Sequence, residues 1–513
     1  MSDHPNQVGP SRKRMGMLDW IAVMGNKLPH PFWLFLYIIA ILLIISNILA
    51  ALGVSAVNPS NNKVVQAMPL ISAEGLRIVT RDFVKNFRDF LPLTNILSMM
   101  VGVGLAEGTG LLGALMRKTI LAVPANLFIP VACLVAVCGN AASDPAIVLL
   151  PALFASIFAA QDKNPLIGVA LGYGVTCTAW AANLGISATN DVVLLGFAEQ
   201  VAKPFKPVAV PVVANWYFNV AAAILTAITA TFVTRKYVEP RLQNEPYVKD
   251  ALDNKSGQVT ELESKGLKYA GIAALVYIAV ILILLLPPNA PLRNPKTGTI
   301  MPSPFIDGLV AIMMFLFFIP SYVYGRVVGT IKKQGDAPKY IYKAIESMAP
   351  FILMCLIVGQ FLALFNYSNI PTILAVKGAE FLKSVGFTGA PLWTVFILFT
   401  TLLNLLIGSS NTKWFAFAPI FVPMLMALGY HPATTTMAYR IGDSVTNGIS
   451  PLFNYYPILL GYVKRYSGRE EVGPMLAALV PYSIANLIGW TILFLIWTAL
   501  GIPLGPGGPV YLP

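Results

Sequence analysis

The sequence predicts an all-α polytopic membrane protein with about nine transmembrane helices and two further interrupted apolar stretches, arranged as an inverted repeat with interrupted helices. Three observations lead to this prediction. Only 11% of the 513 residues are charged and 56% are hydrophobic, and the mean hydropathy is +0.70. Many apolar runs are long enough to cross a hydrocarbon core of about 30 Å. A short polar motif occurs twice inside such runs.

The composition argues against several other classes of protein. A soluble globular chain carries roughly 25% charged residues. The net charge of +12 comes from basic residues in the loops between apolar runs, which is typical of membrane topology rather than of nucleic-acid binding. The sequence has no GKS or GKT phosphate loop and no Cys/His pattern typical of zinc. We therefore expect no cofactor other than a coupling ion, Na⁺ or H⁺.

The elements follow from the apolar runs in chain order. Continuous runs predict spans near residues 31–53, 93–115, 166–200, 211–234, 268–288, 305–325, 345–366, 433–463 and 474–503. Two further stretches, 120–160 and 390–430, are interrupted by the polar sequences GNAASDP and GSSNTKW. Each of these stretches is either two spans or one re-entrant hairpin, and both choices give the same topology.

Charge patterning divides and orients the chain. We expect a cytoplasmic N-terminal segment (1–30), a first transmembrane half (31–234), a cytoplasmic linker (235–268) and a second transmembrane half (269–513). With the N-terminus inside, the inside loops hold twice as many Lys and Arg residues as the outside loops, which predicts a cytoplasmic N-terminus and a C-terminus on the opposite side. The basic outside sequence RIVTRDFVKNFRDFL (77–91) predicts an amphipathic helix on the membrane surface.

The repeated motif reads GISATND at 185–191 and GDSVTNG at 442–448. The shared residues are Gly185, Ser187, Thr189 and Asn190 in the first copy and Gly442, Ser444, Thr446 and Asn447 in the second. Each copy follows an interrupted apolar stretch, and an odd number of spans separates the copies, so the second is inverted relative to the first. Inverted repeats of interrupted helices are typical of secondary transporters, which bind substrate and ions at mid-membrane where the breaks meet.

Arg440 and Asp443 lie in the second copy, inside an apolar run. A charge at mid-bilayer costs about 3 kcal/mol even on the more lenient insertion scale. At a spacing of i, i+3 the two side chains can share a helix face and partly offset each other. They indicate either substrate and ion binding or a structural ion pair that fixes the helix. The polar residues of the other half favour binding.

The hairpin tips and breaks supply the other candidate residues. Asp144 and Asp191 either couple an ion or proton or cap a half-helix. Asn404 bonds either a backbone group or an ion. The candidate ion-binding or coupling residues are Ser143, Asp144, Ser187, Thr189, Asn190, Asp191, Asn404, Ser410, Asp443, Ser444, Thr446 and Asn447.

Substrate binding is assigned to a second, overlapping set. Trp414 either stacks on an aromatic ligand or anchors at the membrane interface. Lys413 is expected to reach water from the hairpin tip, with a role in binding an anionic substrate as the alternative. Pro432 and Pro451 flank the charged segment and are expected to set its break. The candidate substrate-binding residues are Asn411, Trp414, Arg440, Asp443, Pro432 and Pro451.

Several motifs along nearly the whole chain are specific in combination. They are GNKLPHPF (25–32), GVGLAE (102–107), ASDPAIVLLP (142–151), ATNDVVL (188–194), ANWYF (214–218), VEPRL (238–242), MPSPFIDG (301–308), APIFVPM (418–424), YHPA (430–433) and RIGDS (440–444). They resemble the p-aminobenzoyl-glutamate transporter (AbgT) family of bacterial membrane proteins, within the wider ion-transporter superfamily.

The resemblance implies nine spans, re-entrant hairpins at 120–160 and 390–430, and a homodimer with a water-filled basin. It also implies roles in substrate or ion handling for positions of this chain that match the family's motifs. These positions are Asp191, Asn404, Asn411, Trp414, Pro432, Arg440, Asp443 and Pro451.

The expected function is ion-coupled secondary transport of p-aminobenzoyl-glutamate or a related small aromatic carboxylate across the bacterial inner membrane. Arg440 would hold a carboxylate by a bidentate contact, and Trp414 would pack on the aryl ring. The resemblance also implies an alternative, a proton-driven efflux pump for sulfonamide-type antimetabolites. A remote alternative is an intramembrane enzyme with Asp144 and Asp191 as an acid pair. The repeated motif has no role in such an enzyme, so we expect a transporter whose partners are the substrate and the lipid bilayer.

Overall fold

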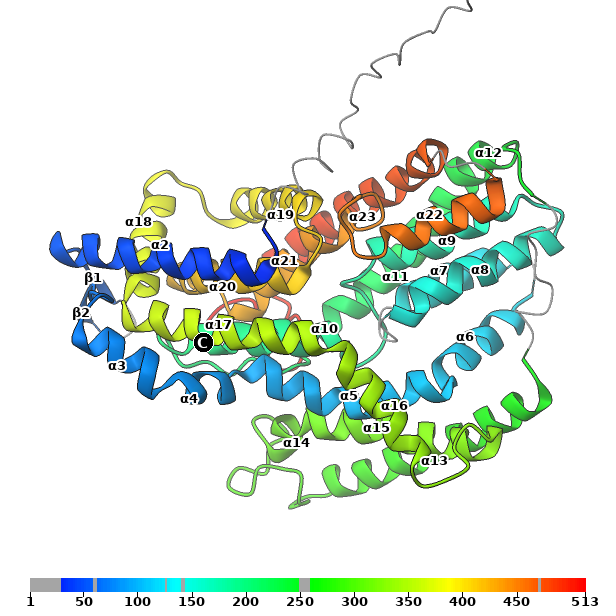
Figure 1. Ribbon diagram of the computed structural model, residues 1–513, viewed down its shortest axis with the longest axis horizontal. Helices are drawn as coiled ribbons and strands as arrows, with labels where there is room; N and C mark the ends of the chain where they lie inside the picture. The colour runs from blue at the N-terminus through cyan, green and yellow to red at the C-terminus, as the bar shows by residue number, and fades with distance from the viewer. Residues whose placement is uncertain (1–28, 59–61, 125–126, 140–143, 249–258, 469–471) are drawn as a thin grey trace, which may run out of the picture.

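The computed structural model describes residues 29–58, 62–124, 127–139, 144–248, 259–468 and 472–513 (Figure 1). These residues are mostly helical, as the sequence predicts, and the predicted fold class is confirmed. A small antiparallel hairpin was not predicted: β1 (Ser55–Asn58) pairs with β2 (Lys63–Gln66) in the loop after the first span.

Eight of the described helical segments are long and apolar enough to cross a membrane. They are α2 (Pro31–Ala51), α5 (Leu91–Thr109), the continuous unit of α11 (Trp216–Val233), η3 (Thr234–Val238) and α12 (Glu239–Leu242), then α13 (Glu261–Leu285), α15 (Leu309–Val328), α17 (Ala349–Tyr367), α19 (Gly389–Leu406) and α23 (Gly473–Ala499). All but α19 coincide with predicted continuous spans. Helix α19 is the first arm of the second predicted hairpin.

The hairpins and interrupted spans occur in the same order in both halves. The first half has α7 (Phe128–Cys138) and α8 (Asp144–Ala160), followed by α9 (Pro165–Thr178) and α10 (Thr189–Ala202). The second half has α19 and α20 (Ser410–Ala427), followed by α21 (Pro432–Val445) and α22 (Tyr456–Ser467). The predicted spans 166–200 and 433–463 are therefore each two helices with a non-helical break between them.

Shorter helices complete the fold: α3 (Ala73–Arg81), α4 (Phe83–Arg88), α6 (Leu111–Leu121), α14 (Pro304–Asp307), α16 (Asp336–Ser347) and α18 (Ile370–Ser384). The predicted surface helix at 77–91 is two helices that meet at Asp82. Helix α16 begins at Asp336, whose carboxylate accepts hydrogen bonds from the backbone N–H groups of Lys333 and Lys332, and these bonds lower its pKa. The predicted linker 235–268 is helical at both ends, and its residues 249–258 lie outside the described part of the chain.

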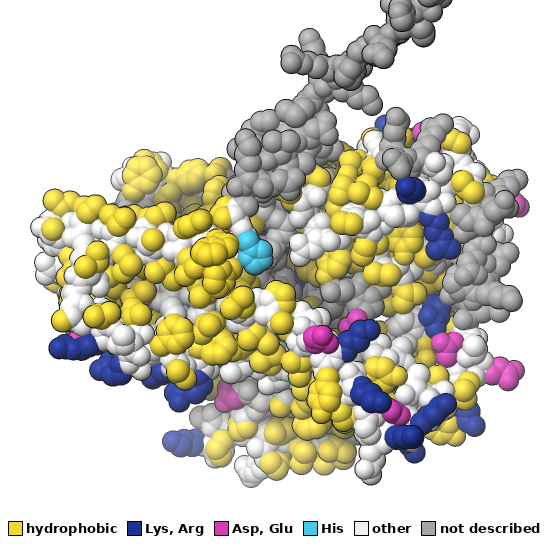
Figure 2. Space-filling model, in the orientation of Figure 1, with side chains coloured by type: hydrophobic (Ala, Val, Ile, Leu, Met, Phe, Trp, Pro, Cys, Tyr) yellow, Lys and Arg dark blue, Asp and Glu magenta, His cyan; other side chains and the backbone are white. Residues whose placement is uncertain are grey.

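Helix packing joins the two halves at the centre of the molecule. Helix α10 packs against α20 and α21, and α9 packs against α21 and α23. Helices α13 and α15 pack on each other and lie along the lower edge of the view in Figure 1. Leu275 and Ile283 of α13 are each 68% exposed, and hydrophobic side chains cover much of the face shown in Figure 2. Such an exposed apolar exterior suits a lipid environment, because helices satisfy their own backbone hydrogen bonds.

Candidate functional site

Several of the predicted polar residues lie where α10, α20 and α21 meet. Helix α10 begins at Thr189 directly after the first break, and α20 begins at Ser410 after the tip at residues 407–409. Helix α21 ends at Val445, where the second break begins. Helix ends leave backbone N–H and C=O groups without helical partners. The packing of α10 against α20 and α21 therefore gathers these groups between the two halves.

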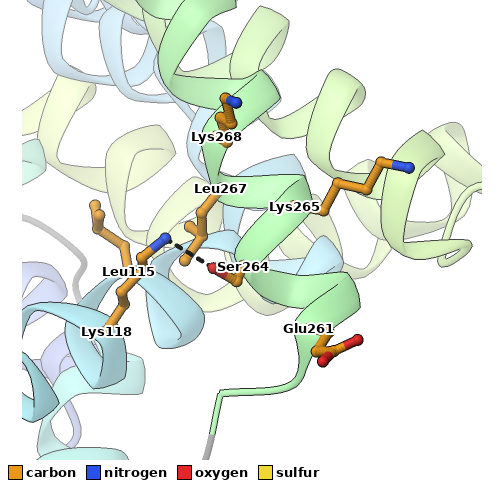
Figure 3. Close-up of a pocket in the computed structure, with 7 residues that line it drawn as sticks. All are labelled: Leu115, Lys118, Glu261, Ser264, Lys265, Leu267 and Lys268. Atoms are coloured by element: carbon orange, nitrogen blue, oxygen red, sulfur yellow. Dashed lines mark hydrogen bonds between the residues drawn. The ribbon is translucent and has the colours of Figure 1, made fainter.

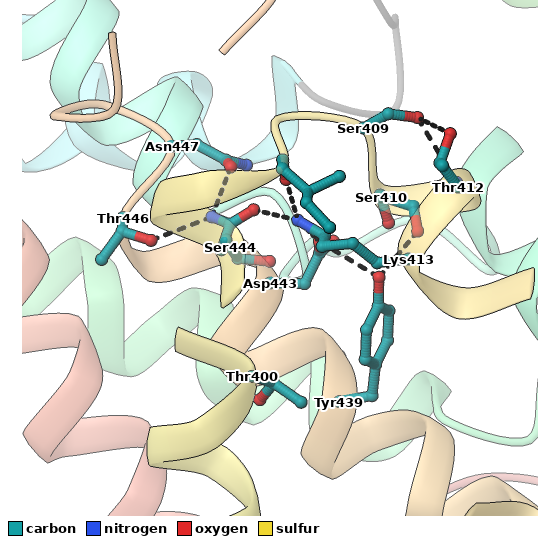
Figure 4. Close-up of polar contacts among 12 residues, drawn as sticks. Thr400, Ser409, Ser410, Thr412, Lys413, Tyr439, Asp443, Ser444, Thr446 and Asn447 are labelled. Atoms are coloured by element: carbon teal, nitrogen blue, oxygen red, sulfur yellow. Dashed lines mark hydrogen bonds and ion pairs between the residues drawn. The ribbon is translucent and has the colours of Figure 1, made fainter. Parts of the chain in front are cut away.

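Lys413 lies at the centre of a buried polar cluster formed by the second half (Figure 4). Its ammonium group forms an ion pair with Asp443, with Nζ 2.7 Å from Oδ1, and the two side chains are 1% and 2% exposed. It also donates to the carbonyl oxygen of Ile407 at 2.8 Å and to the side-chain oxygen of Asn404. The Asn404 amide in turn donates to Thr446 Oγ1 at 2.9 Å and to Asn447 Oδ1 at 2.8 Å. These contacts thus connect α19 and α20, the two arms of the second hairpin, to the second break.

Two aromatic rings line the same region. Trp414 is fully buried, and its ring centroid lies 4.5 Å from that of Tyr439. The indole N–H of Trp414 donates to the carbonyl oxygen of Leu194 in α10 at 2.9 Å. The Tyr439 hydroxyl donates to the carbonyl oxygen of Ser410 at 2.7 Å and lies 3.3 Å from Asp443 Oδ1. Burial contradicts the interfacial alternative for Trp414, because the ring packs on Tyr439 inside the protein.

Arg440 connects the second half to the first. Its guanidinium forms an ion pair with Asp191 at the start of α10, and both side chains are 1% exposed. It also donates to the carbonyl oxygen of Trp180 at 3.4 Å. The other carboxylate oxygen of Asp191 accepts the backbone N–H of Ala188 at 2.9 Å. Asp191 therefore caps a half-helix and pairs with Arg440 at the same time. This agrees with the capping alternative, and a role in ion or proton coupling stays a prediction.

One sequence-based expectation about the charges was wrong. Lys413 does not reach water, because its ammonium group is turned toward Asp443 and is buried with it. Arg440 and Asp443 each have an ion-pair partner on another helix, and the Asp443 charge also stabilises the Arg440 charge, as their spacing predicts. The i, i+3 spacing places Arg440 and Asp443 on one helix but carries no information about residues on α10 and α20.

The remaining second-half candidates lie around this cluster. The Ser444 hydroxyl donates to the carbonyl oxygen of Arg440 at 2.7 Å. Ser410 and Asn411 lie in the first turn of α20, where the Ser410 hydroxyl and the Asn411 side-chain oxygen are buried without a hydrogen-bond partner among the described residues. Pro432 is the first residue of α21, and Pro451 follows Ser450 in the second break.

The first-half candidates lie in or beside the first break. The Ser187 hydroxyl donates to the carbonyl oxygen of Ala188 at 3.3 Å, and Thr189 is the first residue of α10. The amide nitrogen of Asn190 is buried without a hydrogen-bond partner among the described residues. Ser143 lies outside the described residues, and the side chain of Asp144 is likewise not described.

Sequence reasoning did not select Asn183 or Tyr439. Asn183 is fully buried in the first break, and neither of its amide atoms has a hydrogen-bond partner among the described residues. A single Asn in the sequence AANLG belongs to no recognisable motif. Tyr439 had a signal, because it directly precedes Arg440 and lies four residues before Asp443, which places Tyr439 and Asp443 on one helix face.

A separate groove lies between α6 and α13 (Figure 3). It has a volume of about 650 Å³ and is lined by Leu115, Lys118, Glu261, Ser264, Lys265, Leu267 and Lys268. Lys118 Nζ donates to Ser264 Oγ at 3.0 Å. None of these residues belongs to the cluster between α10, α20 and α21.

Comparison with known proteins gives consistent results along the chain. Residues 16–512 match the model of the AbgT putative transporter family. The chain belongs to the AbgT family. It is 38% identical over 501 residues to the p-aminobenzoyl-glutamate transport protein of Escherichia coli (strain K12), covering 97% of this chain and 98% of that protein.

Two solved structures of AbgT transporters resemble the whole chain. The YdaH transporter of Alcanivorax borkumensis, described as having an unusual topology, superposes with a TM-score of 0.88 at 34% identity and covers 93% of this chain and 100% of its own. MtrF of Neisseria gonorrhoeae, described as illuminating a class of antimetabolite efflux pumps, gives a TM-score of 0.90 at 37% identity and covers 96% of this chain and 100% of its own. Together with its apolar helices, this membership identifies the chain as a multi-pass inner-membrane transporter.

Proposed function

We propose that this AbgT protein is an ion-coupled secondary transporter of p-aminobenzoyl-glutamate or a related aromatic carboxylate. The observation that carries the proposal is the pair of buried ion pairs, Arg440 with Asp191 and Lys413 with Asp443, at the junction of the two halves. Buried charges are stable only when paired, so an entering ion or charged substrate has to exchange partners with them. Such an exchange couples binding to the relative movement of the halves.

Arg440 is the proposed carboxylate ligand. Its planar guanidinium can bind a carboxylate with two parallel hydrogen bonds, so a substrate carboxylate is expected to replace Asp191 as its partner. Trp414 and Tyr439 form a buried aromatic pair beside Asp443, and an entering aryl ring would pack against them once the halves separate. The substrate named for the Escherichia coli relative contains both groups, an aryl ring and carboxylates, which supports this assignment.

Export is the second candidate function, and the likeness to MtrF favours it. Sulfonamide antimetabolites and p-aminobenzoyl compounds share a p-aminophenyl ring with a polar substituent in the para position. One site that recognises this ring can serve import or export, because the direction of net transport depends on the imposed gradients.

The coupling ion and the assembly are also part of the proposal. We propose Na⁺ or H⁺ as the coupling ion, acting at the polar residues of the two breaks and hairpin tips. The distribution of Lys and Arg supports a cytoplasmic N-terminus and a periplasmic C-terminus. The family resemblance supports a homodimer.

The test is uptake of labelled p-aminobenzoyl-glutamate into proteoliposomes, with a Na⁺ gradient and a pH gradient imposed separately. We expect accumulation driven by one of the gradients, and its loss in Asp443→Asn, because the neutral amide removes the charge that exchanges partners. Asp307→Asn is the matched control, since Asp307 is exposed at the end of α14 and distant in sequence from the cluster.

Each outcome distinguishes the candidates. Gradient-driven accumulation that persists in Asp443→Asn would overturn the coupling role of that residue. Extrusion of a labelled sulfonamide from loaded vesicles, without uptake of p-aminobenzoyl-glutamate, would favour export. Recovery of a chemically altered ligand would favour the enzyme alternative.

A further inference from the structure

We propose that the ammonium group of Lys413 is the resident cation of the second-half site, and that it excludes alkali cations from that site. This inference rests on the proposed function, because excluding an ion matters only in an ion-coupled transporter. Its test measures stability and sodium binding and does not require transport. It makes Lys413 a specificity-determining residue for the coupling ion.

The ammonium group occupies the position that a small cation would take. Three oxygens surround it, from the Asp443 carboxylate at 2.7 Å, the Ile407 carbonyl at 2.8 Å and the Asn404 side chain. An ammonium group has three N–H donors and no acceptor, so these three oxygens satisfy it fully. Carbonyl and carboxylate oxygens at a helix break are also the ligands that transporters use for Na⁺.

The helix ends explain why a cation is stable at this point. Ile407 directly follows the last residue of α19, and carbonyl groups at a helix C-terminus carry partial negative charge. Asn404 is fixed by its two bonds to Thr446 and Asn447, which leave its side-chain oxygen directed at Lys413. The site is therefore preorganised for a positive charge.

The position of Lys413 on its own helix argues against a merely local role. It lies in the first turn of α20, where the helix dipole disfavours a cation. Its side chain instead extends away from that helix end to the C-terminal end of α19 and to α21. The lysine side chain, which is covalently attached to α20, thus supplies the positive charge that a bound ion would otherwise supply.

The proposal predicts a gain of function when the tethered charge is removed. In Lys413→Ala, the oxygens of Asn404, Ile407 and Asp443 remain and the space of the lysine side chain is vacated. We expect Na⁺ to bind there, because an uncompensated carboxylate at 2% exposure is otherwise strongly unfavourable. For the wild type, we expect no sodium binding at this site and no change in stability when sodium is replaced by choline.

The experiment measures the thermal midpoint and ²²Na⁺ binding of the full-length protein in detergent, without substrate, in sodium chloride and in choline chloride at equal ionic strength. For a dissociation constant of about 10 mM, about 0.1 M Na⁺ raises the ratio of folded to unfolded Lys413→Ala roughly tenfold. Lys413→Arg retains a tethered cation and is expected to behave as the wild type does. Lys268→Ala, an exposed lysine of α13, controls for loss of one positive charge.

Several results would overturn the proposal. Equal destabilisation of Lys413→Ala in both salts, without ²²Na⁺ binding, would make the Lys413–Asp443 contact a structural ion pair only. Sodium binding by the wild type that is lost in Asp443→Asn would mean that Na⁺ and the lysine do not exclude each other. If Lys413→Ala cannot be purified in either salt, the wild type still tests the proposal, because ²²Na⁺ binding that is lost in Asp443→Asn would overturn it. The readouts need no transported substrate, so failure of the proposed function leaves them interpretable.

Discussion

The two helix breaks carry the same motif but differ in how they are packed. In the second half, the residues from Arg440 to Asn447 are all buried, and their polar side chains are bonded to Asp191, Lys413, Asn404 or nearby backbone. In the first half, Leu184 and Ile186 are 40% and 41% exposed, and neither amide atom of Asn183 has a hydrogen-bond partner among the described residues. The second break is closed and mostly bonded, with Nε of Arg440 as an exception among the described residues, and the first break is partly exposed.

This difference indicates at which break the binding of a ligand would be more favourable. A buried polar group without a partner costs about 1–3 kcal/mol. A water molecule, ion or substrate group that bonds the amide of Asn183 removes that penalty at the first break. At the second break the resident charges already satisfy one another. We infer that the two copies of an inverted repeat are held in different states, as alternating access requires.

The largest expected effect comes from breaking the ion pair that joins the two breaks. Arg440→Gln leaves the Asp191 carboxylate buried at 1% exposure without its partner, and we expect a loss of about 3–5 kcal/mol in the free energy of unfolding. The double variant Asp191→Asn/Arg440→Gln removes both charges and should recover most of that loss. Thermal unfolding of the purified variants measures this. A double variant no more stable than the single one would show that the breaks are not coupled through this pair.

The second prediction tests the difference in packing directly, with the matched glycines of the motif. A Cβ atom on Gly442 would lie 2.0 Å from Thr400 Oγ1 and 2.6 Å from the Ile397 carbonyl oxygen, so α21 and α19 would have to separate. Among the described residues, a Cβ atom on Gly185 would meet only Asn183 Oδ1, at 3.4 Å. We expect Gly442→Ala to lower stability by about 1–3 kcal/mol and Gly185→Ala to change it by less than about 0.5 kcal/mol. Thermal unfolding of the purified variants measures both changes. Equal losses of stability in the two variants would contradict the difference in packing between the breaks.

Much of the fold could be predicted from the sequence because the signals are local. Long apolar runs predict the spans, and the repeated G-x-S-x-T-N pattern predicts the two breaks and their inversion. Helix α18 was missed because it is short and carries Lys377, Glu380 and Lys383, which lower its apolar character. The β1–β2 hairpin was missed because its strands are only four residues long.

The structure brings several of the predicted residues together, but the sequence did not predict how their charges pair. Buried charges such as Arg440 and Asp443 stand out in an apolar run, because a charge there needs a role. Which charge pairs with which depends on how α10, α20 and α21 pack, and spacing along one helix does not encode that. One feature of the sequence could have identified Lys413 as part of the site. It is a cation in the first turn of a helix, a position that the helix dipole disfavours unless another group binds the cation.

The smallest expected effect on stability concerns the matched serines of the motif. Ser444 and Ser187 each donate to a nearby backbone carbonyl, at 2.7 Å and 3.3 Å. The carbonyl oxygen of Ala188 retains the N–H groups of Asp191 and Val192 when Ser187 becomes alanine. We therefore expect Ser187→Ala and Ser444→Ala each to change stability by less than about 0.5 kcal/mol.

Transport should separate these two serines where stability does not. Ser187 is 5% exposed and lies in the first break beside the exposed Ile186, whereas in our proposal the Lys413 ammonium already fills the second-half site. Loss of one hydrogen bond to a ligand lowers the apparent affinity about fivefold, so we expect that change in the substrate or ion dependence of Ser187→Ala and almost none in Ser444→Ala. Proteoliposome uptake at varied substrate and ion concentrations measures it. The reverse order would place the exchangeable ligand at the second break and would contradict a resident lysine cation there.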